Sequence, residues 1–163
     1  MPEPIRIAAL AGATLSTGLT AGLFFAYTCS VMPGLAVTDD RTLVGAMQSI
    51  NRKILNGWFL AAFLGAVLLI ALAAALHLPH GGPVPGWTVA ALVGYLVTLG
   101  VTMGVNVPLN DQLDAAGPVD RIADLAAVRE RFEATWVRWN LVRTISSSFA
   151  FACLIAALLT RRG

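Results

Sequence analysis

Long stretches without a charged residue recur along this sequence and restrict what it can fold into. No Asp, Glu, Lys or Arg occurs between Ile7 and Thr38, or between Leu55 and Leu78. Hydrophobic residues make up 57% of the 163-residue chain, and charged residues make up 12%. A helix needs about 20 apolar residues to cross the hydrocarbon core of a bilayer, which is roughly 30 Å thick. The sequence therefore predicts an integral membrane protein.

Four segments are long and apolar enough to be membrane helices. We expect Pro33, followed by Gly34, to end the first of them and Pro108 to end the third, because proline cannot continue the hydrogen-bond ladder. Arg161 and Arg162 follow the fourth. The predicted spans are about 7–32, 57–78, 87–107 and 141–160.

The connections between the spans differ in character. HLPHGGPVPG is a short turn, so the second and third spans should be antiparallel neighbours. The other two connections have apolar residues at spacings of three and four, which predicts amphipathic helices over about 39–55 and 119–139 at one end of the bundle. The predicted fold is an all-α, integral membrane four-helix bundle that forms a single domain, 1–163. The order of span, proline and amphipathic helix occurs twice, so internal duplication stays open.

Several site types are disfavoured by composition and spacing. No run of five Lys or Arg is present, so we expect no nucleic-acid partner. Cys29 and Cys153 lack a zinc-binding spacing and are interpreted as buried apolar thiols. His77 and His80 form an HxxH pair without a third ligand nearby, so we expect no metal. GxxxG patterns at 18 and 22, and at 100 and 104, predict close helix contacts.

A polar strip crosses the predicted boundary between the last amphipathic segment and the last span. Its members are spaced by three or four residues and therefore share one helix face: Arg129, Glu133, Trp136, Asn140, Arg143 and Ser147. A span of about twenty residues must fit before Arg161, so Asn140 and Arg143 should lie at or inside the membrane boundary.

Polar residues flank the same border in the other helices. NVPLND surrounds Pro108, QSINR precedes the second span, and Tyr27 lies within two turns of Pro33. Together these groups predict an apolar pocket with a polar rim, suited to a flat hydrophobic molecule with a few oxygen atoms. The expected binding residues are Asn51, Asn106, Asn110, Trp136, Trp139, Asn140 and Tyr27. The alternative is that these residues form structural ion pairs, cap helices or anchor the interface.

Five motifs occur in order along most of the chain: GLFFAYTCSVMPGL, DDRT, AMQSINRKILN, NVPLND and FEATWVRWNLVRT. Together they resemble the anthrone oxygenase-like small membrane proteins. The resemblance implies a four-helix membrane protein, and characterised members oxidise anthrones to anthraquinones with molecular oxygen, without a metal or organic cofactor. The polar positions that match are Asn51, Arg52, Asn106, Asn110, Asp111, Glu133, Trp136, Arg138, Trp139, Asn140 and Arg143.

The chemistry of an anthrone suggests roles for these residues. A base that removes a proton from its acidic CH₂ creates an anion able to give an electron to oxygen. Glu133 is the expected base and Asp111 is its rival. Arg143 and Arg52 would hold the developing oxyanion, and Trp136 would stack on the rings. We expect no cofactor, with oxygen as co-substrate.

Two other functions stay open. One is a membrane protein that binds a hydrophobic small molecule, or assists a partner protein, without chemistry. The other is a purely structural role for the polar end. We expect the lipid bilayer as partner, in the cytoplasmic membrane of a bacterium. Counting Lys and Arg places the long connections in the cytoplasm, whereas net charge favours the termini there, so the orientation stays open, as do the substrate and the oligomeric state.

Overall fold

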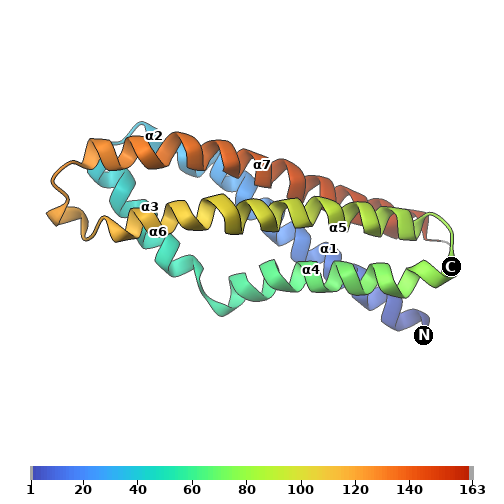
Figure 1. The fold of residues 1–163 in the computed structure, drawn as a ribbon. Helices are drawn as coiled ribbons and strands as arrows, with labels where there is room; N and C mark the ends of the chain where they lie inside the picture. The colour runs from blue at the N-terminus through green and yellow to red at the C-terminus, as the bar shows by residue number, and fades with distance from the viewer. Residues whose placement is uncertain (1, 162–163) are drawn as a thin grey trace.

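The computed structural model describes residues 2–161, and Arg162 lies outside these. Four long helices run side by side in an elongated bundle, with shorter helices at one end and both termini at the other (Figure 1). The long helices are α1 (Glu3–Ala26), α4 (Gly57–His77), α5 (Val84–Val101) and α7 (Leu125–Thr160). No strand occurs in the described residues. The predicted all-α fold, with four helices long and apolar enough to cross a membrane, is confirmed.

Two of the long helices continue past the prolines that were expected to end them. α1 passes through a π-helical turn, Tyr27–Val31, into α2 (Met32–Ala36), and α5 passes through Thr102–Asn106 into α6 (Val107–Ala115). In each turn a backbone N–H bonds five residues back, from Met32 to Tyr27 and from Val107 to Thr102. These longer bonds give hydrogen-bond partners to backbone groups that a proline, which has no N–H group, would otherwise leave without one. The predicted helix ends at Pro33 and Pro108 are therefore wrong.

Helix α3 (Asp40–Ile54) connects the first membrane helix to the second at the end where the shorter helices gather (Figure 1). The Asp39 side chain begins it by accepting a hydrogen bond from the Thr42 backbone N–H at 2.9 Å. Asn56 then begins α4 by accepting from the backbone N–H groups of Trp58 and Phe59, each at 3.1 Å. These side-chain caps satisfy donors that have no partner inside the helix and mark the bend between α3 and α4.

The segment 119–139 is not a separate helix. A 3₁₀ turn, Val119–Arg121, precedes α7, whose first turn is capped by the Asp124 side chain. The whole of α7 is 36 residues long. At about 1.5 Å per residue this is roughly 54 Å, well beyond the roughly 30 Å of a bilayer core. One helix therefore carries the polar strip from outside the membrane into the last span.

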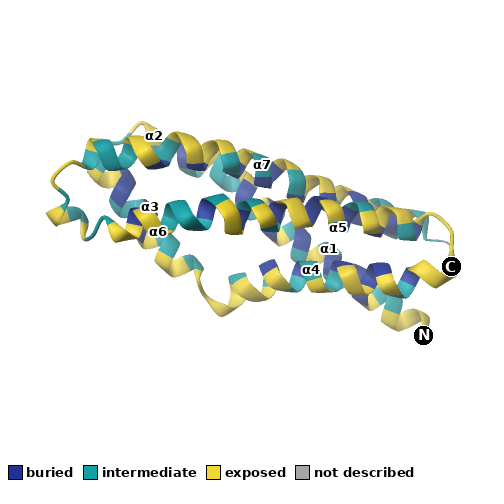
Figure 2. Ribbon diagram, in the orientation of Figure 1, coloured by how far each residue is buried: buried dark blue, intermediate teal, exposed yellow. Residues whose placement is uncertain are grey.

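Burial divides the molecule into two packed regions (Figure 2). The larger region lies between the four long helices and includes Leu10, Ile70, Tyr95 and Leu154, all fully buried. The smaller one lies among α2, α3, α6 and α7; it includes Met32, Leu43, Val44, Met47, Leu113, Phe132 and Trp136. This second cluster holds the end of the bundle in place around the polar residues.

Many large apolar side chains remain exposed on the outer faces of the long helices, such as Leu19 at 60% and Leu68 at 69%. In a membrane protein these faces contact lipid tails instead of water. Cys153 is buried as predicted, but Cys29, in the π-helical turn that follows α1, is exposed. The expectation of two buried thiols is therefore wrong for Cys29.

Candidate functional site

A cavity of about 180 Å³ lies where the long helices meet α3 and α6. Residues of α1, α3, α4, α6 and α7 line it, together with Thr102 of the second π-helical turn. Its apolar lining includes Leu23, Phe24, Leu55 and Phe59. The volume is below the roughly 300–1,000 Å³ of most ligand pockets, so a flat ring system would extend into the open mouth.

Arg143 of α7 is the buried cation of this cavity, with 5% of its surface exposed. Its guanidinium carbon lies 4.4 Å from the ring centre of Phe24 and 5.1 Å from that of Trp136. Its Nη2 donates to Asn140 Oδ1 at 2.9 Å, whereas its Nε is buried and has no acceptor in residues 2–161. The two rings and the amide hold the guanidinium, and its buried Nε–H is available to a ligand oxygen.

Asn140 connects Arg143 to the π-helical turn of α1. Its Nδ2 donates to the Phe24 carbonyl at 3.1 Å and to Thr28 Oγ1 at 2.9 Å. Thr28 Oγ1 lies 2.8 Å from Thr144 Oγ1 of α7. The Phe24 carbonyl also accepts from the Thr28 hydroxyl at 3.1 Å and from the Tyr27 backbone N–H. The Phe24 carbonyl and the Thr28 hydroxyl therefore orient Asn140, and through it Arg143.

Trp136 forms a second wall of the cavity. Its Nε1 donates to Asn110 Oδ1 at 2.8 Å, and its ring centre lies 5.5 Å from that of Tyr27. Behind it, Asn106 donates to the Trp136 carbonyl at 3.3 Å. Asn106 Oδ1 and Asn51 Nδ2 are both buried without a partner in residues 2–161. Because Asn51 also lines the cavity, its amide is a second donor available to a ligand.

The carboxylates near the cavity differ in how they are paired. Asp111 and Asp114 both line it, and Asp114 lies 3.2 Å from Arg52 Nε. Asp111 forms no ion pair within 4.0 Å in the described part of the chain. Because no cation engages its oxygens there, Asp111 is the better candidate base on the rim.

Glu133, the first predicted base, is placed elsewhere. Its Oε2 accepts from Arg129 Nε at 2.6 Å, and Glu133 is not among the residues that line the cavity. Arg129 also donates to Asp40 and to the carbonyls of Ala36 and Thr38, at 3.1, 2.9 and 2.9 Å. This arrangement ties α7 to the turn between α2 and α3, which is a structural use of both charges.

The sequence-predicted residues therefore divide into three groups. Seven line the cavity: Tyr27, Asn51, Arg52, Asn110, Asp111, Trp136 and Arg143. Asn106 and Asn140 lie behind it and bond to its walls, whereas Glu133 and Trp139 are outside the lining. Sequence reasoning missed Phe24, Thr28 and Asp114. Phe24 lies three residues before Tyr27 on the same helix face, and this spacing would have indicated Phe24 as a site residue. Thr28 is placed at the site by the π-helical turn, which the sequence did not predict.

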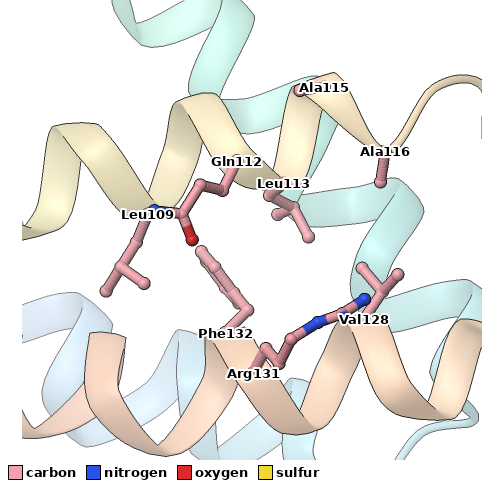
Figure 3. A pocket seen from close by; sticks show the side chains of 8 residues that line it. All are labelled: Leu109, Gln112, Leu113, Ala115, Ala116, Val128, Arg131 and Phe132. Carbon is pink, nitrogen blue, oxygen red and sulfur yellow. The ribbon is translucent and has the colours of Figure 1, made fainter.

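A larger depression of about 420 Å³ lies outside this cavity, between α6 and α7. Figure 3 shows side chains of the two helices, including Gln112 and Phe132, facing each other across it. Arg131 is its one charged lining residue, and it has no carboxylate. Without a base or a buried unpaired donor, this depression offers less chemistry than the smaller cavity.

Within residues 2–161, no group of three or more His, Cys, Asp or Glu side chains is arranged to hold a metal ion. His77 is buried and His80 is exposed, at the end of the bundle away from the cavity.

Comparison with known proteins gives one match. No curated protein and no solved structure matches the chain. The family model described as anthrone oxygenase matches residues 47–153, which is more than half of the chain. The matched region contains Asn51, Asp111, Trp136 and Arg143 of the cavity. The chain thus belongs to the anthrone oxygenase family.

Proposed function

We propose that this protein oxidises an anthrone-type polycyclic aromatic substrate with molecular oxygen in the cavity lined by Asp111 and Arg143. The observation that carries the proposal is Arg143, a buried cation between two aromatic rings with an unused N–H group. A buried, unpaired donor in an apolar cavity suits an oxygen atom on which negative charge develops. Membership of the anthrone oxygenase family supports the same reaction class.

The reaction begins with a proton transfer. The Asp111 carboxylate takes one proton from the CH₂ group of the anthrone, and the electron pair moves onto the carbonyl oxygen. Arg143 and Asn51 donate hydrogen bonds to this oxyanion, which lowers the free energy of the anion and of the transition state that leads to it. The flat rings of the substrate lie against the aromatic wall formed by Trp136 and Tyr27.

Oxygen then enters as the oxidant. The anion gives one electron to O₂, and the resulting radical and superoxide combine at the former CH₂ carbon to form a peroxide anion, which takes the proton from Asp111. Asp111 next removes the second proton from that carbon while the O–O bond breaks, and the leaving hydroxide takes up this proton as water. The sum is anthrone plus O₂ to anthraquinone plus water.

The experiment is to measure oxygen consumption and quinone absorbance when the purified protein in detergent is given a simple anthrone, with protein-free detergent as the spontaneous rate. Wild type should exceed that rate. Asp111→Asn should lower turnover by about 10²- to 10⁴-fold, the usual contribution of a general base. Glu133→Gln is the matched control and should stay within a few-fold of wild type.

Each alternative result assigns a different function. Loss of turnover in Glu133→Gln alone would return the role of base to Glu133. A folded wild type with no turnover above the spontaneous rate would refute the oxygenase. The same cavity would then be interpreted as a binding site without chemistry, and saturable quenching of the tryptophan fluorescence by the anthrone would support that function.

A further inference from the structure

A second polar cavity lies at the opposite end of the bundle, where the termini are (Figure 1). It measures about 50 Å³, and the described residues that line it are all ionisable: Glu3 and Arg6 at the start of α1, His77 at the end of α4, and Arg161 after α7. None of them takes part in the proposed oxygenase site. Three chain segments that are distant in sequence therefore bring charged groups together here.

Two guanidinium nitrogens at this cavity have no acceptor. Arg6 Nε and Arg161 Nη1 are buried and form no hydrogen bond within residues 2–161. Among residues 2–161, Glu3 is the one carboxylate of the lining, and its Oε1 is 3.8 Å from Arg161 Nη1, too far for a hydrogen bond. A buried charged donor without an acceptor costs free energy, so both nitrogens are suited to a ligand with more than one acceptor oxygen.

The charge of the lining favours an anion. Within residues 2–161 the lining has two arginines and one glutamate, so its excess charge is positive. His77 is 4% exposed and forms a fixed wall, because its Nδ1 lies 2.8 Å from the Ala73 carbonyl. The volume equals that of one or two water molecules, so the cavity admits the oxygen atoms of a small anionic group rather than a whole molecule.

A larger neighbouring cavity indicates what the anionic group is attached to. It measures about 420 Å³, shares Arg161, and is otherwise lined by Gly82, Pro83, Leu159 and Thr160. Leu159 is 80% exposed at the end of the last membrane span. A ligand held by Arg161 would thus have an apolar surface beside it, at the depth where a bilayer places its headgroups.

We propose that this end of the bundle binds the phosphate group of an anionic phospholipid. Arg6 Nε and Arg161 Nη1 donate to the phosphate oxygens, and the glycerol and acyl part lies in the neighbouring cavity along Leu159. Phosphate matches guanidinium donors in charge and in geometry. The proposal is independent of the oxygenase reaction.

The test uses the full chain in detergent and three added probes: phosphatidylglycerol, phosphatidylcholine and inorganic phosphate. Thermal unfolding and native mass spectrometry report on binding. Phosphatidylglycerol should raise the unfolding midpoint of wild type and remain attached in the mass spectrometer. The double variant Arg6→Gln with Arg161→Gln should bind it at least about tenfold more weakly, because two charged hydrogen bonds are lost. Arg121→Gln, an exposed site at the other end, is the matched control and should bind like wild type.

A further variant separates ligand binding from fold stability. Glu3→Gln removes the competing carboxylate and should strengthen phosphatidylglycerol binding; if Glu3 and Arg161 formed only a structural pair, this variant would leave lipid binding unchanged. Equal effects of phosphatidylcholine and phosphatidylglycerol would overturn the proposal, as would wild-type lipid binding by the double variant. Inorganic phosphate that protects as well as the lipid at equal concentration would identify a free-phosphate site and exclude the lipid.

Discussion

The sequence predicts on which face of the last helix Arg143 lies, but only the structure shows which groups surround its charge. It lies on the predicted polar face of α7, and no carboxylate lies within 4.0 Å of it in the described chain. Two rings and the Asn140 amide surround it instead. A buried cation in a membrane protein is costly when it has no counter-charge, and such residues mark functional sites more often than structural ones.

Replacing Arg143 by lysine tests whether the guanidinium matters beyond its charge. Lysine keeps one positive charge but has no Nε–H donor and no planar group to stack between Phe24 and Trp136. We expect Arg143→Lys to fold and to lose about 10²-fold or more in anthrone turnover, as when an oxyanion donor is removed. Arg138→Lys, at an exposed position five residues earlier in α7, should keep wild-type turnover. If Arg143→Lys had the same turnover as Arg138→Lys, the Arg143 guanidinium would have no specific role in the reaction.

At the scale of elements, the π-helical turn in α1 is what joins this helix to α7 at the site. Thr28 lies in the turn and bonds to both Asn140 and Thr144. We expect Thr28→Val to lower the free energy of unfolding by about 1–3 kcal/mol, because the buried groups of α7 lose a partner. Thr14→Val is the control: its hydroxyl bonds only to the Leu10 carbonyl of its own helix, so a smaller effect is expected. Denaturation in detergent measures the difference.

The start of α3 makes a prediction about pH. Hydrogen bonds from the backbone and then the side chain of Thr42 lower the pKa of Asp39 below its usual value of 3.8. A carboxyl group whose pKa is lower in the folded state than in the unfolded state stabilises the fold fully at a pH above the unfolded-state pKa. This stabilisation is lost as the pH falls through the lowered pKa of the folded state. Wild type should therefore lose thermal stability relative to Asp39→Ala between about pH 5 and pH 2. A pH-independent difference between the two proteins would contradict this role of Asp39.

At the scale of the whole molecule, the close packing of α5 on α7 holds the bundle together. A Cβ atom at Gly94 would lie 2.8 Å from Phe149 Cδ1 and 3.2 Å from the Ser146 carbonyl. The predicted GxxxG contacts are only partly found: Gly18 is close to Phe151, but positions 22, 100 and 104 have no atom within 4 Å of such a Cβ. The small residue that matters most in the third span is therefore Gly94.

Alanine at two glycines of the third span should have opposite effects. Gly94→Ala should lower the free energy of unfolding by about 1–3 kcal/mol, because Phe149 and the backbone of α7 must shift. A Cβ atom at Gly100 would have no heavy atom within 4 Å, so Gly100→Ala should be neutral or stabilising by up to about 1 kcal/mol, because alanine has a higher helix propensity than glycine. Unfolding curves of the two variants in the same detergent compare them directly. Equal destabilisation would mean that backbone effects dominate over the α5–α7 contact.

The sequence by itself determined the properties that depend on local composition and spacing. Uncharged windows identified four membrane helices, since transfer of a segment into lipid depends on its own residues. Three- and four-residue spacing placed Trp136, Asn140 and Arg143 on one buried face of α7, since helix geometry alone decides that. Of the five motifs quoted for the family resemblance, NVPLND, FEATWVRWNLVRT and nearly all of AMQSINRKILN lie in the region that the family model matches, whereas the first two precede it.

Only the tertiary structure decided which groups meet. The sequence favoured Glu133 as the base over its rival Asp111, but Arg129 pairs with Glu133, and Asp111 is the one that lines the cavity. The structure also decided the fate of the two prolines, because π-helical turns with five-residue backbone bonds carry both helices past them. Pairing across the bundle joins residues more than one hundred positions apart, such as Phe24 and Asn140. No local pattern encodes such a contact, because its free energy exists only once the helices have assembled.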